Sequence, residues 1–251
     1  MRFLKIKCQG AFNSYRQPDF HTYHKTLPLP PKTTIAGLMG SALGISPSEV
    51  NTEWLLTERF KMGIVGSANG QANDLWQIRK YESKQIKSYQ TGKESTPYKT
   101  AVIVRELLYQ SKITLYLYFE NGDDYDLLKQ AFLSPKWALS LGREDELIKI
   151  ISIEDVELNL IEEEYQLKET VVAADLAELN YRPLIDAGLS GNILDAAPKT
   201  LTLPMSFTTS KDLEVRTANE FKRFTFIGSL PILLKGEAFW DKSENAFFQI
   251  F

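Results

Sequence analysis

The sequence predicts an α+β fold with the element order strand, helix, strand, basic insertion, strand, helix, strand, followed by further strands. Two observations predict this order. Apolar and polar residues alternate in segments such as 113–119, as in a half-buried strand, whereas the apolar residues of 35–43 repeat at helical spacing. The βαββαβ order is that of ferredoxin-like and RRM-like folds. We therefore expect such a core over residues 1–160 and an acidic, strand-rich region over residues 161–251.

The first predicted elements are a strand, a loop and a helix. Residues 2–8 alternate in the manner of a half-buried strand, and residues 9–32 are too rich in proline for a helix or a central strand. A threonine, Thr33 or Thr34, is expected to cap the helix that follows, because its oxygen can accept from the free N–H groups of the first turn. Gly44 is expected to end that helix.

A second short helix is expected directly afterwards. Ser46 and Glu49 have the spacing of a capping box, and Pro47 stands at the first helical position between them. A short strand over 60–66 follows. These signals place two helices between the first two strands of the predicted core.

The second half of the core repeats the pattern. After the strand at 113–119, a helix is expected to start at Asn121 and to end at Pro135. Residues 148–160 alternate again with one irregularity, which predicts a strand with a slip or bulge. The insertion between the central elements, about 76–106, is expected to form a projecting basic hairpin.

Composition sets the broad class of protein. The chain has 251 residues, of which 43% are hydrophobic and 24% are charged, and this length suits one large domain or two small ones. Cys8 is the only cysteine, which excludes a disulfide framework and a cysteine-based zinc site. The longest apolar runs fall short of the roughly 20 residues that a membrane helix needs, and the N-terminus lacks the apolar stretch of a signal peptide. We expect a soluble, cytoplasmic protein.

The charges are distributed unevenly along the chain. Residues 1–112 carry 16 Lys and Arg against 8 Asp and Glu, whereas residues 113–251 carry 13 against 24, so net charges of +8 and −11 give the total of −3. Such asymmetry suggests a basic surface for a polyanion and an acidic surface elsewhere. A chance imbalance of solvated faces is the alternative.

The basic segment 76–105 gives the strongest local signal. It holds seven Lys or Arg residues against two Glu, with one tryptophan and three tyrosines interleaved. Cations bind phosphates, and aromatic rings offer stacking surfaces for bases, so the segment suits single-stranded RNA. A solvated loop without a partner is the other interpretation.

The glycine-rich helix start at 33–44 resembles a phosphate cradle but lacks the ending of a Walker A loop. Gly37 and Gly40 each cost about 1 kcal/mol relative to alanine inside a helix, which suggests that another backbone approaches closely. That backbone could belong to the protein's own sheet or to a nucleic-acid strand. His21 and His24 are the only histidines and have no cluster of carboxylates nearby, so no metal site, cofactor or catalytic residue is expected.

Three segments resemble the fifth family of CRISPR-associated proteins. They are Ala-Phe-Asn-Ser-Tyr-Arg at 11–16, Leu-Pro-Leu-Pro-Pro-Lys-Thr-Thr with the glycine-bearing helix at 27–44, and Leu-Ser-Leu-Gly-Arg-Glu-Asp at 139–145. They occur in the order and spacing of that family. The resemblance implies a RAMP protein with an RRM-like fold and a thumb hairpin, which would be the segment 76–106.

The resemblance also implies a function. Members of the family sit at the foot of the type I effector complex (Cascade), hold the 5′ handle of the guide RNA, and contact the large subunit and the neighbouring backbone subunit. The expected role is a non-catalytic RNA-binding subunit in antiviral defence, of subtype I-B or similar. Contact with target DNA near the protospacer-adjacent motif is left open.

Candidate RNA-binding residues come from two sources. The family motifs imply seven of them, which are Ser14, Arg16, Lys32, Thr33, Thr34, Gly40 and Arg143. The chemistry of the basic segment, without a matching motif, suggests four more, which are Lys84, Lys87, Tyr89 and Lys93.

The alternative function is cleavage of precursor guide RNA without a metal ion. The type I-C branch of the same family does this with a tyrosine, a lysine and a histidine. The corresponding stretch here reads Thr-Pro-Tyr-Lys-Thr at 96–100 and has no histidine. Tyr98 and Lys99 alone make a poor acid–base pair near neutral pH, since their reference pKa values are about 10 and 10.4.

Overall fold

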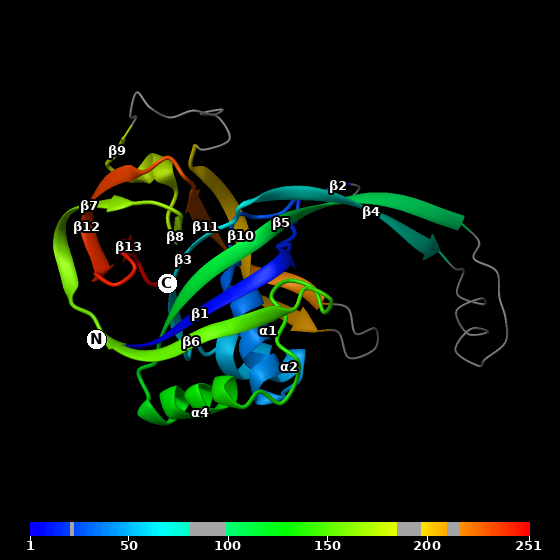
Figure 1. Cartoon of the computed structure of the whole chain (residues 1–251), viewed down its shortest axis with the longest axis horizontal. Coiled ribbons are helices and arrows are strands. Elements are labelled where there is room, and N and C mark those ends of the chain that lie inside the picture. The colour runs from blue at the N-terminus through cyan, green and yellow to red at the C-terminus, as the bar shows by residue number, and fades with distance from the viewer. Residues whose placement is uncertain (21–22, 81–98, 185–196, 210–215) are drawn as a thin grey trace.

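The computed structural model describes residues 1–20, 23–80, 99–184, 197–209 and 216–251. Within these ranges the chain is a strand-rich mixed α/β protein, as Figure 1 shows. The helices are α1 (Lys32–Leu43), α2 (Pro47–Val50), a π-helical turn at Asn51–Leu55, α4 (Gly122–Leu133) and a 3₁₀ turn at Leu176–Glu178. The strands are β1 (Arg2–Asn13), β2 (Tyr23–His24), β3 (Lys61–Ser67), β4 (Gly70–Lys80), β5 (Lys99–Tyr118), β6 (Ile148–Glu157), β7 (Leu160–Leu167), β8 (Thr170–Val172), β9 (Tyr181–Pro183), β10 (Lys199–Thr209), β11 (Arg216–Ile227), β12 (Ile232–Asp241) and β13 (Ala246–Phe248).

The larger sheet has the order β10-β11-β8-β3-β5-β1-β6, and β2 and β4 also pair with β5. One face of its centre packs against α1 and α4. Ile6 of β1 and Leu115 of β5 point to this side and are fully buried with Ile35 of α1 and Leu128 of α4. The alternation seen in the sequence therefore produces one apolar face, which the helices cover.

The opposite face of the larger sheet is only partly covered. The smaller sheet, β13-β12-β7 with β9 paired to β12, places Phe239 and Phe248 against Phe3 and Tyr116. The ring of Tyr116 stacks on that of Phe248 with centroids 3.9 Å apart. Strands from both sides of residue 160 thus belong to the larger sheet, while the expected boundary at that residue stays a prediction.

A buried ion pair ties the two sheets together. Lys5 of β1 is 1% exposed, and its Nζ lies 2.7 Å from the Asp241 carboxylate at the end of β12. The Tyr116 hydroxyl donates to the same carboxylate at 2.8 Å. Burial disfavours the Asp241 carboxylate, but hydrogen bonds from Lys5, Ser243 and Tyr116 more than offset this, so its pKa falls to about 2.

Strands β4 and β5 form a hairpin that projects from the body of the protein (Figure 1). The strand expected at 113–119 is the inner end of β5, which runs without interruption through 20 residues. The part of the expected insertion from Lys99 onward and the central strand are therefore one element rather than two. The four candidate residues Lys84, Lys87, Tyr89 and Lys93 lie outside the described residues.

Local signals at the helix ends have mixed outcomes. The capping box of Ser46 and Glu49 is present, Gly44 ends α1 in the left-handed conformation, and the Asn121 side chain caps α4. The prediction that Thr33 or Thr34 caps α1 is wrong, because Pro31 occupies the N-cap without a side-chain hydrogen bond. The threonines stand inside the first turn instead, and this leaves their hydroxyls available for other contacts.

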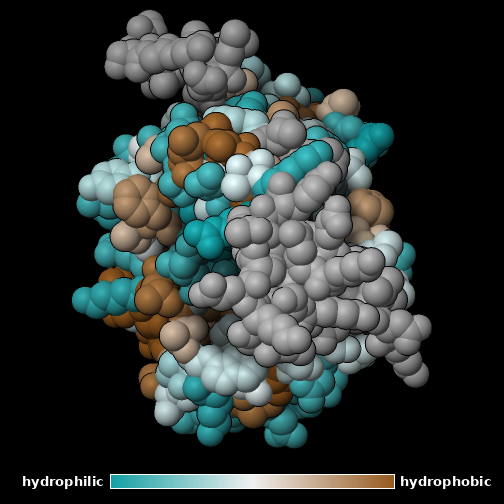
Figure 2. Space-filling view, turned by 90° about the vertical axis from the view of Figure 1, so that its right-hand side faces the viewer, coloured by the Kyte–Doolittle hydropathy of each residue, from teal (hydrophilic) through white to brown (hydrophobic). Residues whose placement is uncertain are grey.

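The outer surface is mixed in character. Figure 2 looks onto the hairpin end of the molecule and shows polar side chains with separate apolar patches between them. Among the described helices, none combines the length and the hydrophobicity that crossing a membrane would require.

Candidate nucleic-acid interface

The three segments that carry the family resemblance meet in space. The end of β1, the start of α1 and the loop at 140–146 together line two adjoining pockets, both of which include Thr34 and Gly142. The pockets lie where α1 begins, beside the base of the projecting hairpin. We treat them together as the candidate interface.

Glu146 fixes the loop to the end of β1. This carboxylate is 5% exposed and accepts hydrogen bonds from the Ser14 backbone N–H at 2.7 Å, the Ser14 hydroxyl at 2.5 Å and the Arg143 N–H at 3.1 Å. Asn13 adds a hydrogen bond from its side-chain amide to the Leu141 carbonyl at 2.7 Å. The hydroxyl of Ser14 is thereby committed to holding the loop. Sequence reasoning did not single out Glu146, although an acid soon after Leu-Gly-Arg is part of the motif.

Gly142 allows the loop to pass close to β1. Its φ is +118°, a conformation that residues with a side chain rarely adopt, and a Cβ there would lie 2.4 Å from the Ser14 carbonyl oxygen. The glycine is therefore required for the approach that brings Arg143 to the base of the hairpin.

The smaller pocket, of about 130 Å³, is rich in cationic side chains. It is lined by Arg16, Lys25, Arg105 and Arg143, with His24 and Glu106 also on its wall. Arg105 is held by Asp74 across the hairpin, with Nε 3.0 Å from the carboxylate. Glu106 accepts from the Thr26 N–H at 2.9 Å. Four cations thus surround a small space, and Asp74, Asp145 and Glu106 offset part of their charge.

Arg143 and Arg105 both lie over the ring of Trp76 on β4. The guanidinium carbons are 4.3 Å and 5.1 Å from the ring centroid, respectively. Cation–π contacts of this kind orient a guanidinium without using its N–H groups. The Nε of Arg143 is buried and has no hydrogen-bond partner within the described ranges, although it forms an ion pair with the Asp145 carboxylate at 3.8 Å. A phosphate oxygen would satisfy this donor.

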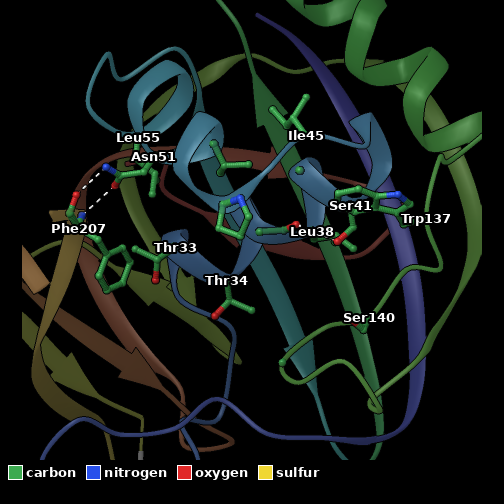
Figure 3. Close-up of a pocket in the computed structure, with 15 residues that line it drawn as sticks. Thr33, Thr34, Leu38, Ser41, Ile45, Asn51, Leu55, Trp137, Ser140 and Phe207 are labelled. Carbon is green, nitrogen blue, oxygen red and sulfur yellow. Dashed lines mark hydrogen bonds between the residues drawn. The ribbon is translucent and has the colours of Figure 1, made fainter. Parts of the chain in front are cut away.

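The larger pocket, of about 360 Å³, carries hydroxyls and aromatic rings. Figure 3 shows Thr33 and Thr34 at the start of α1, with Phe207 of β10 on one side and Trp137 and Ser140 on the other. Asn51 holds Phe207 in place through two backbone contacts, donating to its carbonyl at 2.6 Å and accepting from its N–H at 2.8 Å. Trp137 is 52% exposed and available for stacking.

The two helix glycines have different surroundings. A Cβ on Gly40 would lie 2.4 Å from Cγ2 of Val50, so this glycine serves the close packing of α1 on α2. A Cβ on Gly37 would meet nothing within 4 Å, and Gly37 lines the larger pocket. Of the two partners considered from sequence, Gly40 contacts the protein itself, although a helix rather than the sheet. The space beside Gly37 is open.

Lys32 stands apart from the other motif residues. It is 5% exposed, its Nζ lies 5.0 Å over the ring of Phe60, and it lines a separate apolar pocket with Leu203 and Phe226. Burial lowers the pKa of Lys32 to about 8. Ser14, Arg16, Thr33, Thr34, Gly40 and Arg143 line the two pockets, whereas Lys32 does not.

Comparison with known proteins assigns the chain to a family. The model of the family described as CRISPR-associated protein (Cas_Cas5) matches residues 3–209, which include all three motif segments and both pockets. No curated protein matches the sequence. Among solved structures, a chain of a "CRISPR RNA-guided surveillance complex" is similar with a TM-score of 0.54 at 14% identity, covering 94% of this chain and 90% of that one. A CRISPR protein from Archaeoglobus fulgidus has a TM-score of 0.54 at 10% identity and covers 100% of this chain and 99% of its own. These likenesses concern the fold, and the match over residues 3–209 places the chain in the Cas_Cas5 family of CRISPR-associated proteins.

Proposed function

We propose that this chain is a non-catalytic subunit of a type I CRISPR effector complex and that it holds the 5′ handle of the guide RNA in the two adjoining pockets. The observation that carries the proposal is the pocket lined by four cations, in which the buried Nε–H of Arg143 has no hydrogen-bond partner among the described residues. Membership of the Cas_Cas5 family supports the type of complex. The large and backbone subunits of that complex are the proposed protein partners.

The two pockets suit different parts of a nucleotide. Arg143, Arg105, Arg16 and Lys25 would bind phosphates, since guanidinium groups donate paired hydrogen bonds to phosphate oxygens. The larger pocket, with threonine hydroxyls and the Trp137 ring, would receive an unstacked base and sugar. The first-turn N–H groups of α1 have no side-chain cap and would add to the attraction for phosphate.

The finer fold assignment belongs to the same proposal. The strands β3-β5-β1-β6 lie side by side, antiparallel, with α1 and α4 on one face. This arrangement supports a ferredoxin-like RAMP core, in which β4 and the outer part of β5 would be the base of the thumb.

The test is RNA binding by the full chain with Arg143 replaced. The probe is the 5′-terminal segment of the guide RNA that co-purifies with the protein, labelled and titrated at several salt concentrations. We expect Arg143→Ala to weaken binding about tenfold or more and to reduce the slope of log K against log salt by about one phosphate contact. Arg143→Lys should restore part of the slope and little of the affinity.

Arg182 provides the matched control. It lies on β9 of the smaller sheet, and its side chain is 68% exposed. Arg182→Ala removes the same charge from the chain without touching either pocket, so affinity should stay near that of the parent protein. Equal affinities for Arg143→Ala and Arg182→Ala would refute the proposed handle site.

Cleavage of precursor guide RNA is the second candidate function, and one observation favours it. His24 lines the cationic pocket together with Glu106, so a group able to exchange protons near neutral pH stands beside cations that could stabilise a phosphorane. Incubation of labelled precursor RNA with the protein in EDTA separates the two functions. Specific cleavage that His24→Ala abolishes would replace the non-catalytic role.

A further inference from the structure

We propose that the uncovered part of the sheet face opposite α1 and α4 is a second binding surface, specific for single-stranded nucleic acid. We call it the back face and define it by Lys7, Gln9 and Phe12 of β1, Tyr109, Lys112 and Thr114 of β5, and Lys149 of β6. The proposal does not depend on the handle site, which is built at the start of α1.

The strand register places these residues on one surface. Gln9 pairs with Lys112 on one side and with Lys149 on the other, so the three side chains form one row across three adjacent strands. Directly paired residues of neighbouring strands point to the same face of a sheet. Gln9 lies two residues beyond Lys7, on the face opposite to Ile6 and Cys8, which are buried under the helices.

An exposed aromatic pair continues this row. Phe12 pairs directly with Tyr109, their ring centroids are 5.4 Å apart, and the rings are 42% and 41% exposed. Their neighbours Asn13 and Leu108 are buried on the helix side, which turns the two rings to the other side. Two large rings left facing solvent on a sheet offer stacking surface that the protein itself does not use.

The charge of the back face is positive. Lys112 and Lys149 are exposed and form no ion pair within the described residues. Lys7 lies 3.1 Å from Glu244, the acid on the rim. A hollow of about 310 Å³ opens between Lys7, Gln9, Lys112 and Glu244, over Thr114 and Gly66.

This combination matches one class of ligand. Aromatic rings on an open sheet stack two or three bases, while lysines beside them neutralise the backbone phosphates. Tyr109 and Lys112 are three residues apart, or about 10 Å along an extended strand, so a short segment of a strand would reach both. A folded protein partner would favour a larger apolar centre than two rings bordered by lysines.

The C-terminal sheet explains why the surface is limited. Phe239 and Phe248 cover the part of the same face around Phe3 and Tyr116, near the start of β1. Among the described residues, only the part of this face toward the hairpin is left open. The bound segment would therefore run beside the base of the hairpin rather than along the whole sheet.

The test uses the full chain with Arg143→Ala in every protein, so that the handle pockets contribute little. Labelled twelve-residue oligouridine and oligothymidine are titrated by fluorescence anisotropy against the background protein and against Phe12→Ala/Tyr109→Ala. We expect the double variant to bind at least about tenfold more weakly, from the loss of two stacking surfaces. Phe12→Tyr/Tyr109→Phe keeps both rings and should bind like the background protein.

Control variants remove the same types of side chain from other parts of the surface. Phe221→Ala/Tyr181→Ala is the control for the ring variant, because it removes two rings that are 57% and 38% exposed and lie outside the back face. The lysine variant of the back face is Lys112→Ala/Lys149→Ala, and its control is Lys168→Ala/Lys235→Ala, which removes two other exposed lysines. Stronger binding of oligouridine would indicate RNA as the source of the strand, and equal or stronger binding of oligothymidine would indicate DNA. Binding that falls no more in the back-face variants than in these controls would overturn the proposal. Normal oligonucleotide binding with loss of co-purifying subunits would assign the surface to a protein partner instead.

Discussion

Replacing Gly37 with alanine should stabilise the protein and, at the same time, lower its affinity for RNA. Gly37 lies inside α1 and has open space where a Cβ would stand, so the substitution introduces no clash. It should therefore gain the difference in helix propensity, about 0.8–1 kcal/mol. The new methyl group, however, would project beside the larger pocket, where we propose that a base and sugar of the handle lie.

The surroundings of the two helix glycines give the expected changes in stability. A gain of about 1 kcal/mol raises the melting temperature of a domain of this length by roughly 2–4 °C. Gly40→Ala provides the contrast on the same helix, because its Cβ would lie 2.4 Å from Cγ2 of Val50. Overpacking of that kind costs about 1–3 kcal/mol, so its melting temperature should fall.

The assay is thermal unfolding of each variant together with titration of the labelled handle RNA. Gly122→Ala is the matched control, since a Cβ at the start of α4 also meets nothing within 4 Å and lies away from both pockets. We expect Gly37→Ala to bind about three- to tenfold more weakly, Gly37→Leu to bind more weakly still, and Gly122→Ala to bind normally. A Gly37→Leu protein that is stable and binds RNA with full affinity would show that the larger pocket does not hold the handle.

Two further predictions concern buried charges. The pKa of Asp241 falls from its usual value of 3.8 to about 2 in the folded protein, so the carboxylate contributes stability above pH 4 that is lost as the pH drops toward 2. Asp241→Asn should flatten this acid limb of a denaturant-stability curve by on the order of 1 kcal/mol, and an unchanged limb would contradict the buried pair. Burial lowers the pKa of Lys32 from 10.5 to about 8, so between these pH values the unfolded chain binds more protons than the folded chain, and stability should rise with pH. Lys32→Met should be more stable than the parent protein at pH 7 and should lack this rise. A parent protein that loses stability over this interval, while Lys32→Met does not, would contradict the reasoning.

Short-range signals predicted the local structure well where one interaction dominates. The Ser46–Glu49 capping box and the turn at Gly44 depend on residues a few positions apart, and both are present. The cap of α1 was mispredicted because Pro31 can take the extended N-cap conformation, which moves both threonines into the helix. The predicted strand at 2–8 is too short, because β1 continues to Asn13 through residues in which apolar and polar side chains do not alternate.

Long-range contacts were beyond the reach of sequence patterns. Trp76, Arg105 and Arg143 meet through the pairing of β4 with β5 and the turn at Gly142, and no periodicity links them. Phe12 and Tyr109 are brought together only by the register of β1 on β5. The motif at 139–145 indicated the right loop, but the buried role of Glu146 depends on the approach of Ser14.

The bond between Lys5 and Asp241 has a consequence for synthesis of the protein. Its two residues are separated by 236 positions, so a ribosome must synthesise the chain through β12 before the lysine can pair with its carboxylate. Until then Phe3 and Tyr116 are exposed to solvent, and such apolar surface is prone to aggregate with other nascent chains. Products of premature termination upstream of β12 would retain an unneutralised cation at this position, and cellular proteases should remove them before they could join an assembly.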